Sequence, residues 1–135
     1  MDSEIFVDTS GFYALLVKED EAHAKAADFV RHAAGKRRFL TTDYVLDETA
    51  TLLKARRQRE VLKPFFAVVL ASEVCRVVWM DPELFATAHT FFLKRGDPAY
   101  SFTDCVSFLV MRAQRIKGAL TKDAHFRQAG FDVLL

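Results

Sequence analysis

The sequence lacks most of the features that would place it outside the class of soluble globular proteins. Only two of its 135 residues are cysteines, Cys75 and Cys105, which are too few for a disulfide scaffold and lack zinc-site spacing. The longest apolar run, Phe65 to Ala71, is far shorter than the roughly 18 residues that cross a bilayer. The acidic first residues do not resemble a secretory signal. We therefore expect a cytoplasmic protein without a membrane segment, folded as one domain over residues 1–135.

A charge excess of either sign is also missing. The chain has 19 Lys and Arg residues and 18 Asp and Glu residues, so the formal net charge is +1. Proteins that bind nucleic acid through bulk electrostatics are usually basic, so any such contact here must come from a local basic patch or a metal ion. Hydrophobic residues make up 51% of the chain, which excludes intrinsic disorder. The five glycines form no phosphate-binding loop, and no Gly-x-Ser-x-Gly motif is present.

Short apolar segments alternate with helical ones along the chain. We expect strands at 4–7, 38–41, 75–80, 118–121 and 131–134. We expect helices at 9–17, 20–34, 44–57, 64–72, 82–94, 102–116 and 123–129, and a turn at Gly96-Asp97-Pro98. This alternation predicts right-handed crossovers and a parallel sheet that is buried on both faces. The predicted fold is α/β, a three-layer α/β/α sandwich around a short parallel central sheet.

Acidic residues occur where the predicted strands end. Asp8 follows the first strand, Asp123 follows the fourth, and Asp104 begins the helix that leads into the fourth. On the helix after the second strand, Glu48 borders the inward stripe, whereas Asp47 points nearly the opposite way. Sites in open α/β sheets form beyond the carboxyl ends of the strands, so we expect Asp8, Glu48, Asp104 and Asp123 to converge there.

Each of these acids has a simpler role open to it. Asp8, Asp104 and Asp123 stand at helix starts, where Asp is a favoured cap, and Glu48 fits an exposed helix surface. As a group, however, crowded carboxylates repel one another unless a cation neutralises them. Oxygen ligands of this kind suit Mg²⁺ or Mn²⁺ rather than Zn²⁺. The four histidines lack zinc-site spacing, and we assign His125 a solvated or packing role.

Four segments form an ordered set with a family likeness. They are Val7-Asp8-Thr9-Ser10, Asp47-Glu48-Thr49, Thr103-Asp104-Cys105 and Leu120-Thr121-Lys122-Asp123-Ala124-His125-Phe126. The set resembles the PIN domain, with its first-strand Asp-x-Ser motif, its Glu position, its third acid and its closing Thr-x-Asp-x-x-Phe stretch. Within that family it resembles the VapC-type toxin ribonucleases. The likeness covers essentially the whole chain.

The resemblance implies a Mg²⁺- or Mn²⁺-dependent endoribonuclease that cleaves RNA with metal-activated water. It implies that Asp8, Glu48, Asp104 and Asp123 are the catalytic and metal-binding quartet, chiefly through Asp8 and Asp104. Ser10 and Thr121 would support the quartet through hydroxyl hydrogen bonds. The resemblance further implies the toxin half of a toxin–antitoxin pair, with a small antitoxin protein as partner and a homodimeric assembly. The expected products carry a 5′-phosphate and a 3′-hydroxyl.

The surfaces that would meet RNA and partners are less well defined. Arg56, Arg57 and Arg59 form a basic cluster that could grip RNA phosphates, the alternative being a solvated helix end. Segment 65–71 is hydrophobic all round, so we expect either a dimer interface or an antitoxin groove there, with burial inside the monomer as the alternative.

Two other functions compete with the nuclease. The first is a catalytically silent PIN-like partner-binding module, which the complete quartet argues against. The second is a phospho-acceptor receiver domain, which would need a second acid beside Asp8, where Thr9 and Ser10 stand instead.

Overall fold

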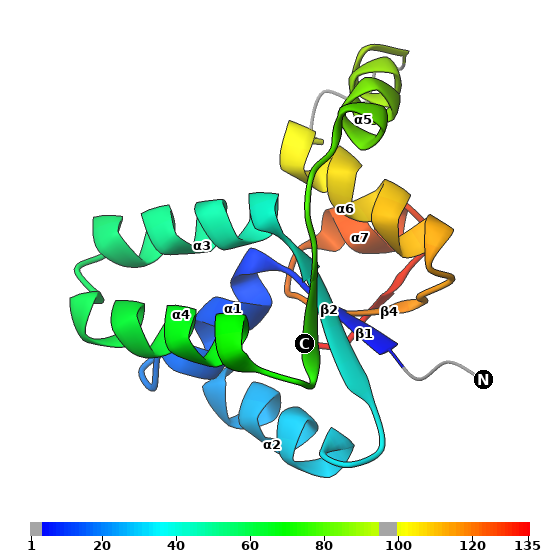
Figure 1. The fold of residues 1–135 in the computed structure, drawn as a ribbon. Helices are drawn as coiled ribbons and strands as arrows, with labels where there is room; N and C mark the ends of the chain where they lie inside the picture. The colour runs from blue at the N-terminus through cyan, green and yellow to red at the C-terminus, as the bar shows by residue number, and fades with distance from the viewer. Residues whose placement is uncertain (1–3, 95–99) are drawn as a thin grey trace.

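Five short parallel strands form the centre of the molecule in the computed structural model, which describes residues 4–94 and 100–135 (Figure 1). In chain order the strands are β1 (Glu4–Val7), β2 (Arg38–Thr42), β3 (Cys75–Val78), β4 (Gly118–Leu120) and β5 (Asp132–Val133). Their order across the sheet is β3-β2-β1-β4-β5, and every neighbouring pair is parallel. The predicted turn at Gly96-Asp97-Pro98 lies outside the described residues.

The helices cover the sheet from two sides. The helices between β1 and β3 are α1 (Thr9–Leu16), α2 (His23–Ala33), α3 (Asp43–Ala55) and α4 (Leu62–Ala71). Those after β3 are α5 (Pro82–Lys94), α6 (Phe102–Ala113) and α7 (Ala124–Gln128). Figure 1 shows the first group on one side of the sheet and α6 and α7 on the other, with α5 packed against α6 farther from the sheet. The three-layer α/β/α fold predicted from the sequence is confirmed.

Several element ends, and one connection between helices, differ from the sequence prediction. Helix α2 begins at His23 rather than Asp20, because the Asp20 carboxylate accepts a hydrogen bond from the Ala22 N–H and forms a turn before the helix. Helix α6 ends three residues early, because Arg115 adopts a left-handed conformation with φ of 58°. A 3₁₀ helix, Arg59–Val61, joins α3 to α4 and was not predicted.

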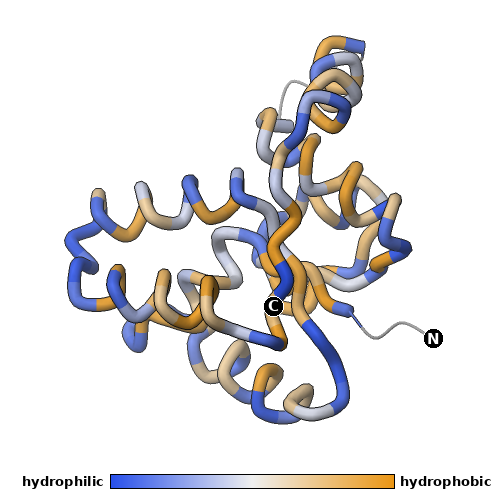
Figure 2. The backbone as a smooth tube through the Cα atoms, viewed as in Figure 1, coloured by the Kyte–Doolittle hydropathy of each residue, from blue (hydrophilic) through white to orange (hydrophobic). Residues whose placement is uncertain are grey.

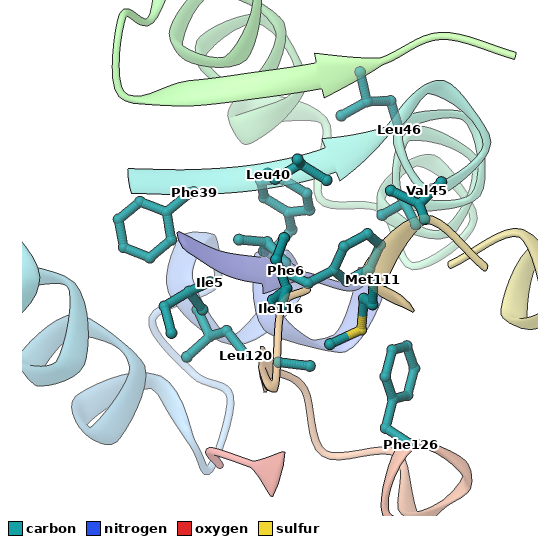
Figure 3. Packing of buried hydrophobic residues seen from close by; sticks show 14 of the residues in the cluster. Ile5, Phe6, Phe39, Leu40, Val45, Leu46, Met111, Ile116, Leu120 and Phe126 are labelled. Carbon is teal, nitrogen blue, oxygen red and sulfur yellow. The ribbon is translucent and has the colours of Figure 1, made fainter. Parts of the chain in front are cut away.

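Apolar side chains pack on both faces of the central strands. Phe6 of β1, Leu40 of β2 and Leu120 of β4 are completely buried, as Figure 3 illustrates. The buried ring of Phe126 packs against Phe6, with 6.2 Å between the ring centroids. Figure 2 shows the hydrophobic stretches along these strands, whereas the α2–β2 and α3–α4 connections are hydrophilic. Because β1, β2 and β4 are covered on both faces, they contain continuous apolar runs rather than an alternation of apolar and polar residues.

Helix α4 buries only one side of its surface. Phe65 and Val69 belong to the core, whereas Phe66, Val68 and Leu70 are 39%, 62% and 61% exposed. Burial inside the monomer therefore accounts for part of this hydrophobic segment and leaves an apolar face open. No helix in the described parts of the chain is long and apolar enough to cross a membrane.

The direction of strand addition reverses beside β1. The chain adds β2 and β3 on one side of β1 and then crosses to add β4 and β5 on the other. The ends of β1 and β4 lie next to each other, and the Asp8 N–H donates to the Leu120 carbonyl at 3.3 Å. Such a reversal opens a crevice at the carboxyl ends of the strands, where open α/β sheets bind their ligands.

Candidate functional site

The four acids singled out from the sequence line one cleft at this reversal. The cleft has a volume of about 520 Å³. Asp8 follows β1, Glu48 lies on α3, Asp104 lies in the first turn of α6, and Asp123 precedes α7. Asp8 and Asp104 are 5% and 8% exposed, whereas Glu48 and Asp123 stand nearer to solvent. Four separate elements therefore bring their carboxylates to the same place.

Hydroxyl groups hold the Asp8 side chain. Thr121, directly after β4, donates its Oγ1 hydrogen to Asp8 Oδ2 at 3.0 Å. Ser10 Oγ lies 3.0 Å from Thr121 Oγ1 and accepts the Lys122 N–H at 2.8 Å. Thr121 Oγ1 also accepts the Asp123 N–H at 3.0 Å. The two hydroxyls named from the sequence thus tie the end of β1 to the loop that carries Asp123.

Glu48 is held by a residue that the sequence reasoning passed over. Thr9 Oγ1 donates to Glu48 Oε1 at 2.6 Å, although Glu48 itself is exposed. Thr49 Oγ1 lies 3.3 Å from Thr9 Oγ1 and donates more closely, at 2.7 Å, to the Val45 carbonyl. Thr9 links the first-strand motif to α3, so Glu48 is fixed toward the cleft, whereas Asp47 is exposed and does not line it.

Asp104 and Asp123 meet at His125. The histidine Nδ1 lies 3.3 Å from Asp104 Oδ2 and 3.3 Å from Asp123 Oδ1. Ligand atoms of these three side chains all lie within 4.8 Å of one another, a spacing that would let them share a metal ion. The His125 ring also packs edge-on against Tyr100, with 5.5 Å between centroids. The packing role expected for His125 is real, but its ring nitrogen faces the acids as well.

The helix-capping alternative holds for two of the acids and fails for a third. Asp123 Oδ1 accepts the His125 N–H at 2.9 Å, and Asp104 forms a capping box with Ser101. Asp8 stands before α1 but makes no side-chain cap bond. Capping engages a single oxygen in each case. The second carboxylate oxygen of Glu48, Asp104 and Asp123 accepts no hydrogen bond from any residue that the structure describes.

The surroundings of Asp8 and Asp104 disfavour the charged forms of both carboxyl groups. Burial, together with the smaller effect of the neighbouring Glu48 and Asp104 charges, raises the pKa of Asp8 to about 7, although hydrogen bonds from the Thr9 backbone and the Thr121 hydroxyl oppose the shift. Burial also raises the pKa of Asp104, and the charge of Asp123 adds to the effect, while bonds from Ser101 and His125 oppose it. A cation between these groups would remove the repulsion and return them to the ionised form.

The donor set fits a hard divalent cation. Four carboxylates face one cleft, two of them buried, and hydrogen bonds from the protein hold one oxygen of each. Oxygen-rich sites of this kind suit Mg²⁺ and Mn²⁺, and the nearby imidazole of His125 is also compatible with Mn²⁺. The arrangement can bind such an ion and present it to an anionic substrate.

Of the three arginines proposed to grip RNA, only Arg56 lines the cleft. Its guanidinium lies over the Tyr13 ring, 5.0 Å from the centroid. Arg57 has a left-handed backbone with φ of 61° and lines a separate depression beside Lys18. Arg59 lies in the 3₁₀ helix and does not line the cleft. The basic cluster of the sequence is therefore divided between different surfaces.

Sequence reasoning missed three residues that contribute to the site: Thr9, Lys122 and His125. A signal existed for each, because all three lie inside the segments that carry the acids. Lys122 Nζ forms an ion pair with Asp20, which also lines the cleft. Neither this pairing nor the Thr9–Glu48 bond follows from local sequence, since the partners are 102 and 39 residues apart.

Comparison with known proteins gives consistent results. The family model of the PIN domain matches residues 5–132. The chain is 35% identical over 134 residues to the 23S rRNA-specific endonuclease VapC20 of Mycobacterium tuberculosis, covering 94% of this chain and 95% of that protein. It is 28% identical over 123 residues to a VapC ribonuclease of Archaeoglobus fulgidus, covering 89% and 77%. The crystal structure of Mycobacterium tuberculosis VapC20, described as a sarcin–ricin loop cleaving toxin, superposes with a TM-score of 0.83 at 34% identity, covering 94% and 95% of the two chains.

Proposed function

The chain belongs to the PIN-domain family of endoribonucleases that includes the VapC ribonucleases, and on this premise we propose that the four-acid cleft is its RNA-cleaving active site. The observation that carries the proposal is the convergence of Asp8, Glu48, Asp104 and Asp123 on one cleft at the strand ends. Purely structural acids would be expected on separate surfaces, where their charges are hydrated. Two of these are buried beside each other instead, with raised pKa values.

Each acid has a separate part in the proposed reaction. Asp8 and Asp104, the buried pair, are the principal ligands of a divalent cation. When bound, this ion supplies Lewis-acid chemistry: it makes water a stronger nucleophile and withdraws charge from the scissile phosphate. Glu48, held by Thr9, and Asp123, held by the His125 N–H, orient the attacking water through their outer oxygens. Thr121 and Ser10 keep Asp8 in place for this geometry.

The physiological ion in this proposal is Mg²⁺, with Mn²⁺ able to replace it. Both ions favour carboxylate oxygens as ligands, and Asp8, Glu48, Asp104 and Asp123 would supply them. Water then attacks the phosphorus, so the ribose 2′-hydroxyl is not the nucleophile. The products therefore carry a 5′-phosphate and a 3′-hydroxyl rather than a 2′,3′-cyclic phosphate.

The proposed substrate is a structured RNA loop, and ribosomal RNA is the first candidate. The relative that is 35% identical is named for its action on 23S rRNA, and its structure is described by cleavage of the sarcin–ricin loop. The alignment with that protein covers 94% of this chain. A hairpin RNA with the sarcin–ricin sequence is therefore the first substrate to assay, followed by total transfer RNA.

The decisive assay compares two adjacent acids on α3. Wild-type protein, Glu48→Gln and Asp47→Asn are incubated with the hairpin RNA in Mg²⁺, in Mn²⁺ and in chelator. We expect discrete, metal-dependent cuts by the wild type and by Asp47→Asn, and a loss of at least about a hundredfold in Glu48→Gln. Cleavage that continues in chelator, or 2′,3′-cyclic ends on the products, would refute the metal-dependent reaction.

The proposed biological role is that of the toxin in a toxin–antitoxin pair, acting as a homodimer in the cytoplasm. The open apolar face of α4, formed by Phe66, Val68 and Leu70, supports the need for a protein partner. Light scattering of dilute protein tests the dimer: a stable monomer would refute it. Co-purification with the product of a neighbouring small reading frame tests the antitoxin.

A further inference from the structure

Lys122 and Asp20 form an ion pair at the edge of the active-site cleft. Lys122 follows Thr121 in the loop after β4, and Asp20 lies in the connection between α1 and α2. The Lys122 ammonium lies 3.1 Å from each carboxylate oxygen of Asp20. Both residues line the same cleft as the four acids. The pair therefore places a cation in the cleft where the RNA is proposed to be cleaved.

The two partners are held differently. Asp20 is fixed in its turn, because its Oδ2 accepts the Ala22 N–H at 3.0 Å and its carbonyl accepts the His23 N–H at 3.0 Å. Its side chain is only 11% exposed. The Lys122 backbone is tied to Ser10, but its side chain is 32% exposed. An ammonium has three N–H donors, and Asp20 engages two of them, so a solvent-borne anion can reach the third.

The charges that line the cleft explain why the Lys122–Asp20 pair matters for RNA binding. Five carboxylates line the cleft, and Arg56 and Lys122 are the permanently charged cations among its lining residues. A single divalent ion does not neutralise five carboxylates, so the cleft repels an RNA backbone unless its cations face the phosphates. Lysine commonly binds phosphate as a point charge.

Resting on the proposed nuclease function, we propose that Lys122 binds a phosphate of the RNA substrate and that Asp20 is its internal counter-ion in the RNA-free protein. On RNA binding, the phosphate takes over hydrogen bonds that Asp20 otherwise accepts. Lys122 is then a substrate-binding residue, and Asp20 competes with the substrate for it. The two halves of one ion pair therefore have opposite effects on RNA affinity, whereas a purely structural pair would show the same effect for both.

The test is a steady-state comparison on a fluorescent hairpin RNA in Mg²⁺. We expect Lys122→Met to raise KM roughly tenfold with little change in kcat, and to lower the salt dependence of log(kcat/KM) by about one. Lys122→Arg keeps the charge and should have a KM close to that of the wild type. Asp20→Asn keeps the shape and the bond from Ala22 but removes the competing charge, so its KM should fall by about threefold.

Exposed neighbours serve as controls for general charge effects. Glu21→Gln and Lys25→Met alter residues that are exposed and do not line the cleft, so their KM should equal that of the wild type. A higher KM in both Lys122→Met and Asp20→Asn, or wild-type KM in both, would overturn the counter-ion proposal while leaving the nuclease intact. A wild-type protein that cleaves no RNA would overturn the nuclease and this proposal together.

Discussion

Replacing Asp8 by Asn should remove a pH-dependent loss of folding stability in the metal-free protein. The folded protein raises the pKa of this carboxyl to about 7, while the unfolded chain releases its proton near pH 4. Between these pH values the folded state holds a proton that the unfolded state has lost. The stability that Asp8 contributes is therefore fully present below about pH 4, falls as the pH rises from 4 to 7, and is lost above about pH 7.

The size of the effect follows from the same two values. Between pH 5 and pH 7 the unfolded carboxyl is ionised and the native one is protonated, so the wild type loses about 3 kcal/mol of stability. Above pH 7 both states are ionised, and the loss from Asp8 stops. Asparagine cannot titrate, and its amide oxygen can still accept the Thr121 hydroxyl bond. Asp104 changes stability in the same direction, and because burial is the main cause of its raised pKa, most of that change is common to both proteins.

Urea unfolding in the presence of a chelator measures this directly. At pH 5 and at pH 8, the free energy of unfolding is compared for wild-type protein and Asp8→Asn. We expect the variant to gain about 3 kcal/mol relative to the wild type between the two pH values. Parallel pH profiles would refute the claim that Asp8 is buried in a site that penalises its charge.

Four further substitutions test other parts of the structure. Thr9→Val removes the hydroxyl that holds Glu48, so the rate of RNA cleavage should fall about tenfold while the melting temperature stays near the wild-type value. An unchanged cleavage rate would contradict the positioning role of Thr9. Gly11→Ala places a Cβ against the backbone carbonyl of Leu120, so the free energy of unfolding should fall by about 3 kcal/mol. Wild-type stability would instead show that α1 can move away from β4. Ser107 has a buried hydroxyl without a hydrogen-bond partner among the described residues, so Ser107→Ala should leave the free energy of unfolding unchanged or raise it by about 1 kcal/mol. Ser101→Ala removes the N-cap of α6, so in the same urea titration the free energy of unfolding should fall by about 1 kcal/mol.

The sheet was predictable because its strands carry a strong local signal. Runs such as Ile5-Phe6-Val7 are short and continuously apolar, which is the pattern of a strand covered on both faces. Helix ends were less predictable. Arg57 and Arg115 adopt the left-handed backbone conformation that glycine usually adopts after a helix. Because neither position is a glycine, the sequence did not predict where α3 and α6 end.

For the site, sequence order located the carboxylates but not what holds them. The position after a strand end predicted that Asp8 and Asp123 would meet, and helical periodicity separated Glu48 from Asp47. The bonds from Thr9 to Glu48 and from Lys122 to Asp20 depend on how α1 packs against α3 and against the loop after β4. Those contacts are tertiary, so no local pattern encodes them. The catalytic and metal-binding roles of the four acids stay predictions.

Metal binding is the property on which the proposed reaction depends most directly. Calorimetric titration of Mn²⁺ into wild-type protein, Asp8→Asn and Asp47→Asn at pH 8 separates the cleft from the exposed surface of α3. We predict saturable binding by the wild type, the same affinity in Asp47→Asn, and loss of that binding in Asp8→Asn. Equal Mn²⁺ affinity in all three proteins would contradict a metal centre built on the buried acids.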